Sequence, residues 1–113
     1  MTWANKLNDT RNQLRALNRT IPDTTRAFGA MQKAVKESGP LEFKVKEFIA
    51  LAIAVSSQCD SCIGLHIEAL IKAGATRDEV ADVLAMNIQM GGGPAMMYAG
   101  KALECYDELA SHG

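Results

Sequence analysis

The chain has 113 residues, 48% of them apolar, and its 12 basic and 13 acidic residues leave a net charge of -1. We expect residues 1–113 to form a single domain with an adequate core of its own. No segment is strongly basic, which argues against nucleic-acid binding. The longest apolar run, residues 48–55, is far shorter than the roughly 20 residues of a membrane span.

The N-terminal residues contain no apolar stretch of the signal-peptide type, so we expect a cytoplasmic protein. The chain has three cysteines, which is an odd count, and structural disulfides are rare in such a reducing compartment. A closely spaced pair of cysteines is there more often catalytic or metal-binding.

The first two predicted elements are amphipathic helices. In residues 3–21 six side chains, all but Thr10 apolar, recur at alternating steps of four and three, which places them on one stripe; they are Trp3, Leu7, Thr10, Leu14, Leu17 and Ile21. A second helical segment follows Pro22 and ends near the turn pair Gly39-Pro40. The side chains that we expect this second helix to turn toward the core are Phe28, Met31, Ala34 and Val35.

The third and fourth segments are more apolar. From Phe48 onward the third segment is apolar on all sides, which is typical of a buried central helix. In so short a chain such a helix needs additional cover, so we expect a homo-oligomer. The fourth segment begins around Cys59 and ends before Gly74, which suits the left-handed position after a helix.

The remaining segments are also helical. Thr76 and Glu79 fit a capping box at the start of a fifth helix, which stops at the glycines of residues 91–93. Pro94 suits the first position of a last helix that runs to about Ala110. No alternating strand pattern occurs, so the predicted fold class is all-α, a bundle of about six helices. The three glycines lack the lysine and preceding strand of a phosphate-binding loop, so we interpret them as a turn.

Two further sets of residues invite an interpretation. Four methionines fall at helical spacing and favour a place in the core or a subunit interface over a substrate pocket; they are Met86, Met90, Met96 and Met97. Cys105 lies on the apolar face of the last helix, where we expect it to be buried and inert.

The reactive residue types concentrate between positions 47 and 66. Cys59 and Cys62 are three residues apart and Cys62 and His66 are four apart, so their side chains share one face of a helix. Both cysteines fall in the first helical turn, where free N–H groups and the helix dipole favour a thiolate. His66 can take the thiol proton. If the third and fourth helices pack antiparallel, Glu47 comes to lie beside His66 as its carboxylate partner.

Three interpretations of this cluster remain open from spacing alone. The cysteines could be two small core residues, but the histidine and the helix start would then be coincidences. A structural zinc site needs four ligands, and only Cys105 and His112 remain as soft candidates, both near the far end of the chain. A redox dithiol fits the residues best, although the βαβ context of a thioredoxin-type site is missing.

The motif Glu-x11-Cys-x2-Cys-x3-His spans Glu47 to His66. With its flanking text, EFIALAIAVSSQCDSCIGLHIEALIKAGAT, it resembles the carboxymuconolactone decarboxylase superfamily in its alkylhydroperoxidase D-like branch, over roughly residues 40–105. The resemblance implies an all-helical domain that forms homo-oligomers, often trimers or hexamers. It also implies a thiol-dependent hydroperoxide reductase that needs no bound cofactor or metal.

The resemblance also implies a role for each motif residue. Cys62 would be the peroxidatic thiolate, Cys59 the resolving thiol, and Glu47 and His66 a proton relay, either direct or through water. The substrate would be a hydroperoxide, and electrons would come from a partner dithiol on a lipoyl-bearing or thioredoxin-like protein.

The chain departs from the best-studied members of this branch at Ser61, where they carry a further histidine. The departure leaves efficiency and substrate preference open. The decarboxylase branch lacks the cysteine pair and acts on a lactone acid, so Cys59 and Cys62 argue against that activity. A decarboxylase-like enzyme with His66 as acid–base, and a non-catalytic assembly protein that could bind a metal, remain as alternatives.

Overall fold

The computed structural model describes residues 2–111, and over that range it contains helices and turns but no β-strand. The helices are α1 (Trp3–Thr20), α2 (Pro22–Glu37), α3 (Phe43–Ser56), α4 (Asp60–Lys72) and α5 (Arg77–Ser111). Gly92, with φ of 70° and ψ of -148°, interrupts α5 and divides it into two arms. The predicted all-α class is therefore confirmed, and the two arms of α5 account for the expected sixth helix.

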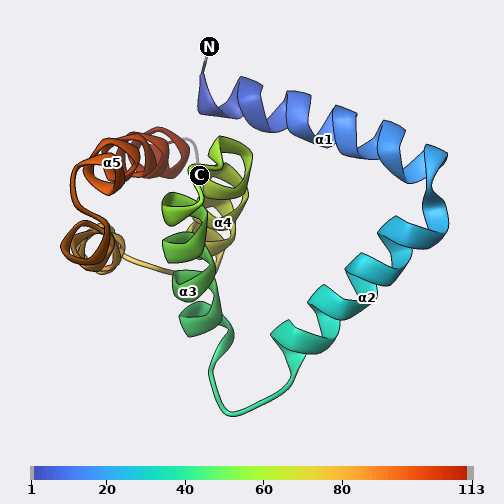
Figure 1. Ribbon diagram of the computed structural model, residues 1–113, viewed down its shortest axis with the longest axis horizontal. Helices are drawn as coiled ribbons and strands as arrows, with labels where there is room; N and C mark the ends of the chain where they lie inside the picture. Colours follow the sequence, from blue (N-terminus) through green and yellow to red (C-terminus); the bar gives the residue numbers. More distant parts are fainter. Residues whose placement is uncertain (1, 112–113) are drawn as a thin grey trace.

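The core lies where α3, α4 and α5 meet, and we call these three elements the core helices (Figure 1). Each of them contributes side chains with no exposed surface: Leu51, Val55, Ile63, Ile67, Leu70, Val80, Ala102 and Cys105. Such burial is the main favourable term in folding, at about 25 cal/mol per Å² of apolar surface. No helix of the described residues is long and apolar enough to cross a membrane.

The first turns of α1 pack against the core helices. Trp3, Leu7 and Thr10 are buried, and the indole nitrogen of Trp3 donates a hydrogen bond to Glu104 over 3.0 Å. Gly64 on α4 makes this approach possible, because a Cβ atom there would lie only 2.8 Å from Cδ2 of Leu7. The start of α1 therefore belongs to the packed body of the protein.

The rest of α1 and all of α2 extend away from that body, and we call residues 11–37 the extension (Figure 1). Leu14, Leu17 and Ile21 continue the stripe of Trp3 but are between 39% and 44% exposed. Helix α2 buries no residue at all. Helical periodicity thus placed these apolar residues on one face, but half of the predicted stripe stays partly exposed in the single chain.

The prediction that the apolar residues of α2 belong to the core is wrong for the single chain. Phe28, Met31 and Val35 are each 56% exposed, and Ala34 is exposed as well. The pattern of a sequence reveals that a helix has an apolar face, but it does not reveal which surface covers that face.

The methionines near the interruption of α5 are not core residues either. Their exposed fractions are 58% for Met86, 78% for Met90, 49% for Met96 and 61% for Met97. A place in the core is therefore excluded for all four, whereas a subunit interface stays a prediction.

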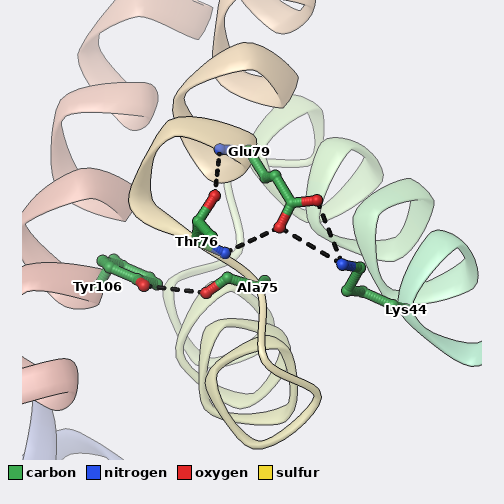
Figure 2. Close-up of polar contacts among 5 residues, drawn as sticks. All are labelled: Lys44, Ala75, Thr76, Glu79 and Tyr106. Carbon is green, nitrogen blue, oxygen red and sulfur yellow. Dashed lines mark hydrogen bonds and ion pairs between the residues drawn. The ribbon is translucent and has the colours of Figure 1, made fainter.

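The capping box at the start of α5 is confirmed and also joins α5 to α3 (Figure 2). The backbone N–H of Glu79 donates to Oγ1 of Thr76 over 3.1 Å, and the N–H of Thr76 donates to Oε1 of Glu79 over 2.9 Å. Lys44 of α3 reaches the same carboxylate at 3.2 Å. The bond from the Thr76 N–H, followed by Lys44, lowers the pKa of Glu79.

Candidate functional site

The turn between α3 and α4 fixes the backbone that precedes the cysteine pair. The N–H of Gln58 donates to the carbonyl of Val55 over 3.1 Å, and the N–H of Cys59 donates to that of Ala54, also over 3.1 Å. These two bonds form a Schellman motif, with Gln58 in the left-handed conformation at φ of 57°. Helix α3 therefore ends in a geometry that places Cys59 at the start of α4.

Cys59 is the N-cap residue of α4, and Cys62 lies in its first turn. The Cys59 sulfur accepts a hydrogen bond from the backbone N–H of Cys62 over 3.2 Å. The two cysteines form a disulfide, with their Cα atoms 5.3 Å apart. A sulfur at this position receives the free N–H groups of the helix end, which stabilise negative charge.

Glu47 and His66 lie side by side, as the sequence predicted for packed neighbouring helices. Oε2 of Glu47 is 2.7 Å from Nδ1 of His66. A carboxylate only accepts hydrogen bonds, so Nδ1 carries a proton in this pair and Nε2 of a neutral imidazole is left as the proton acceptor. Glu47 is only 3% exposed, whereas the His66 side chain is 30% exposed. The imidazole thus links a buried carboxylate with the surface.

The sequence did not reveal that a third residue, Lys36, completes this group. Its ammonium forms an ion pair with Oε1 of Glu47, the oxygen that His66 does not use. Lys36 comes from the last turn of α2 and also lies 5.5 Å from the centroid of the Phe43 ring. No local spacing relates Lys36 to Glu47, because a loop separates their helices, so no sequence signal could have identified the pair.

A cleft of about 700 Å³ lies between the extension and the core helices, and Lys36, Glu47, Cys62 and His66 all line it. The other lining side chains are mostly apolar and include Leu14, Phe28, Ala50, Leu65 and Ala69. This volume falls in the usual range of small-molecule sites, about 300–1,000 Å³. The structure thus brings one cysteine of the pair and the Glu47–His66 pair to a single cavity.

Ser61, which stands where the best-studied members of the branch carry a histidine, contacts α1. Its hydroxyl lies 3.0 Å from the hydroxyl of the buried Thr10. The residue is therefore part of the contact between α1 and α4.

The third cysteine, Cys105, is fully buried and remains a free thiol. Burial, with a smaller contribution from Glu108, raises its pKa to about 12. The expectation that Cys105 is buried is thus confirmed. His112, the other soft ligand that the sequence offered, lies outside the described residues. Within residues 2–111 no three His, Cys, Asp or Glu side chains are grouped as a metal site.

Known proteins are similar to this chain in both sequence and architecture. The model of the carboxymuconolactone decarboxylase family matches residues 22–104. An uncharacterized protein of Cupriavidus necator is 43% identical over 104 residues, which is 92% of each chain. In structure, the chain is similar to a carboxymuconolactone decarboxylase family protein from Legionella pneumophila, with 39% sequence identity, a TM-score of 0.92 and coverage of 96% of both chains.

A more distant structure comes from Thermotoga maritima and is described as a family protein that is a candidate for the antioxidative response. It is 27% identical, has a TM-score of 0.79 and covers 94% of this chain and 91% of its own. The similarity in sequence and the similarity in structure both extend over nearly the whole length of the chain. The protein belongs to the carboxymuconolactone decarboxylase family.

Proposed function

We propose that the protein is a thiol-dependent hydroperoxide reductase. The observation that carries this proposal is the cysteine pair in the first turn of α4, with Cys62 and the Glu47–His66 pair lining the same cleft. The antioxidative description of the Thermotoga maritima relative supports the same class of chemistry. A lactone decarboxylase would have no use for the dithiol.

In the first step, Nε2 of His66 takes the thiol proton of Cys62. The resulting thiolate attacks the terminal oxygen of the hydroperoxide, the O–O bond breaks, and two electrons pass from sulfur to the peroxide. Cys62 becomes a sulfenic acid, and the departing alkoxide takes the proton back from His66 and leaves as an alcohol. Glu47 holds the imidazole through Nδ1 in both protonation states.

We assign the peroxidatic role to Cys62 because His66 lies one turn from it on the same helix. Cys59 then attacks the sulfenic sulfur, water leaves, and the Cys59–Cys62 disulfide forms. A separation of 5.3 Å between the Cα atoms suits this bond. A partner protein with a lipoyl or thioredoxin-like dithiol reduces the disulfide and is itself oxidised, which completes the electron balance.

The lining of the cleft favours an organic hydroperoxide. Leu14, Phe28 and Leu65 offer apolar surface to an alkyl or aryl group, which hydrogen peroxide lacks. We therefore propose that organic hydroperoxides have the higher kcat/KM.

We also propose that the chain forms a homo-oligomer, either a trimer or a hexamer. The large exposed side chains on α2 and α5 support this, and so do Ile49 and Ile53 on α3, which are 47% and 60% exposed. Apolar surface of this extent is unusual on a monomer. Light scattering at several protein concentrations would give the mass, and a monomer at all of them would contradict the proposal.

The activity can be tested by the turnover of cumene hydroperoxide with dihydrolipoamide as reductant. We expect the wild-type protein to turn over and Cys62→Ser to be inactive. In a separate reaction without reductant, Cys59→Ser should consume one equivalent of hydroperoxide and end as the Cys62 sulfenic acid, because the second thiol needed for the disulfide is missing. His66→Ala should lower the rate by about 10²–10⁴-fold, as expected for a lost general base. Glu47→Gln should also lower the rate, because the imidazole loses the carboxylate that holds Nδ1.

A wild-type protein that fails to consume the hydroperoxide would overturn the proposal. Near-wild-type rates in His66→Ala and Glu47→Gln would remove only the proton relay. A Cys59→Ser/Cys62→Ser double variant that decarboxylates a lactone acid would support the decarboxylase alternative instead.

A further inference from the structure

The Glu47 carboxylate is the most buried charged group near the site, and it has two partners. It is 3% exposed, with Oε2 bonded to His66 and Oε1 paired with Lys36. A charge removed from water is expensive unless a counter-charge and hydrogen bonds compensate for it. His66 alone cannot supply that counter-charge while it also serves as a neutral base.

The backbone around Lys36 is held in place although α2 buries none of its residues. Lys46 of α3 donates hydrogen bonds to the carbonyl oxygens of Val35 and Ser38, at the C-terminal end of α2. These carbonyls are among those that a helix end leaves without intrahelical partners. The last turn of α2 is therefore fixed to α3 beside Glu47, which directs the Lys36 side chain to the carboxylate.

We propose that Lys36 is a positioning residue of the hydroperoxide reductase, an inference that rests on the proposed function. Its ammonium supplies the counter-charge of the buried carboxylate and holds Oε1, so that Oε2 stays directed at Nδ1 of His66 and Nε2 is left to accept the Cys62 proton. Without that cation the carboxylate would lose one of its two partners and would no longer be held in this orientation. His66 would then be less well placed to accept the proton.

The test measures the rate of Cys62 oxidation by cumene hydroperoxide in a single turnover of the reduced protein. We expect Lys36→Met, which keeps the length of the side chain, to lower this rate by about tenfold or more, part of the effect of a general base. Lys36→Arg should restore most of the rate, because it returns the cation. Lys72→Met, at an exposed lysine in the last turn of α4, is the control and should react at the wild-type rate.

A double-mutant cycle separates positioning from a structural contribution. Because Lys36 acts through Glu47, Lys36→Met should have no further effect in a Glu47→Gln background, whereas a general distortion of α2 would reduce the rate again. Any one of three results would overturn the inference about Lys36 and leave the proposed function intact. Lys36→Met could react at the wild-type rate, the losses in the cycle could be additive, or Lys36→Arg could be as slow as Lys36→Met. A wild-type protein that does not react would overturn the proposed function and this inference together.

Discussion

Helix α2 and the core helices contribute to the protein in different ways. The core helices bury side chains completely, from Leu51 on α3 to Cys105 on α5, whereas α2 buries none. Yet α2 provides Lys36, which pairs with the buried Glu47 of the candidate site. A helix can therefore contribute a side chain to a candidate site while it adds little to the packing of the single chain.

The largest expected effect separates these two regions by their stability. Ile67 on α4 is fully buried, so Ile67→Ala should lower the free energy of unfolding by about 2–5 kcal/mol through lost burial and a cavity. Met31→Ala on α2 removes a side chain that is 56% exposed in the single chain, so at protein concentrations where the chain is monomeric it should change this free energy by less than about 0.5 kcal/mol. Urea unfolding followed by circular dichroism measures both.

A large loss of stability in Met31→Ala at concentrations where the chain is monomeric would break the comparison, because α2 would then be covered within the chain. A loss that appears only at higher protein concentrations would instead support the proposed homo-oligomer, with a second copy of the chain covering α2. Equal small losses in both variants would contradict the description of the core.

A smaller effect should come from glycines on the two regions. Gly64→Val would force side-chain atoms against Leu7 and should cost about 1–3 kcal/mol of unfolding free energy, as overpacking usually does. A Cβ atom at Gly29 on α2 would meet nothing within 4 Å, so Gly29→Ala should stabilise the protein by up to about 1 kcal/mol through helix propensity. Thermal unfolding would confirm the contrast if the melting temperature fell in Gly64→Val and rose in Gly29→Ala. A higher melting temperature in Gly64→Val would contradict it.

The smallest effect concerns acid stability at two ion pairs, Lys44–Glu79 between α3 and α5 and Arg77–Asp107 within α5. The pKa of Glu79 is lowered from 4.5 by the Thr76 N–H and then Lys44, and the pKa of Asp107 is lowered from 3.8 by Arg77. A carboxylate whose pKa is lower in the folded state stabilises the fold above its unfolded pKa. That contribution is lost as the pH falls from about 4.5 through the lowered pKa values.

Melting temperatures between pH 7 and pH 3 would measure this loss. In Glu79→Gln the melting temperature should fall less between pH 7 and pH 3 than in the wild type. The control is Asp23→Asn on α2, where the carboxylate is 97% exposed, and its melting temperature should fall as much as that of the wild type. If the melting temperature of Glu79→Gln fell as much as that of the wild type, the Lys44–Glu79 pair would not contribute to acid stability.

The sequence predicted those parts of the fold and site that depend on local spacing. The capping box at Thr76, the left-handed Gly74 and the start of α4 at Cys59 all depend on neighbours in the chain. The proximity of Glu47 and His66 was also predictable, because they lie on consecutive helices joined by a tight turn.

The parts that the sequence did not predict depend on where a whole helix packs. The apolar face of α2 was recognised, but its direction depends on the loop that joins α2 to α3. Lys36 was missed for the same reason, since only the position of α2 brings its ammonium to Glu47. The apolar pattern also cannot distinguish the core of one chain from an interface, which explains the misplaced Phe28, Met31 and Val35.

The most direct test of the proposed function is a mass-spectrometric map of the three cysteines. The reduced protein would receive one equivalent of cumene hydroperoxide, and free thiols would then be alkylated. We predict a Cys59–Cys62 disulfide together with an unoxidised Cys105, whose raised pKa of about 12 keeps it a thiol at neutral pH. Cys59 and Cys62 that both remain free and alkylatable would contradict the account.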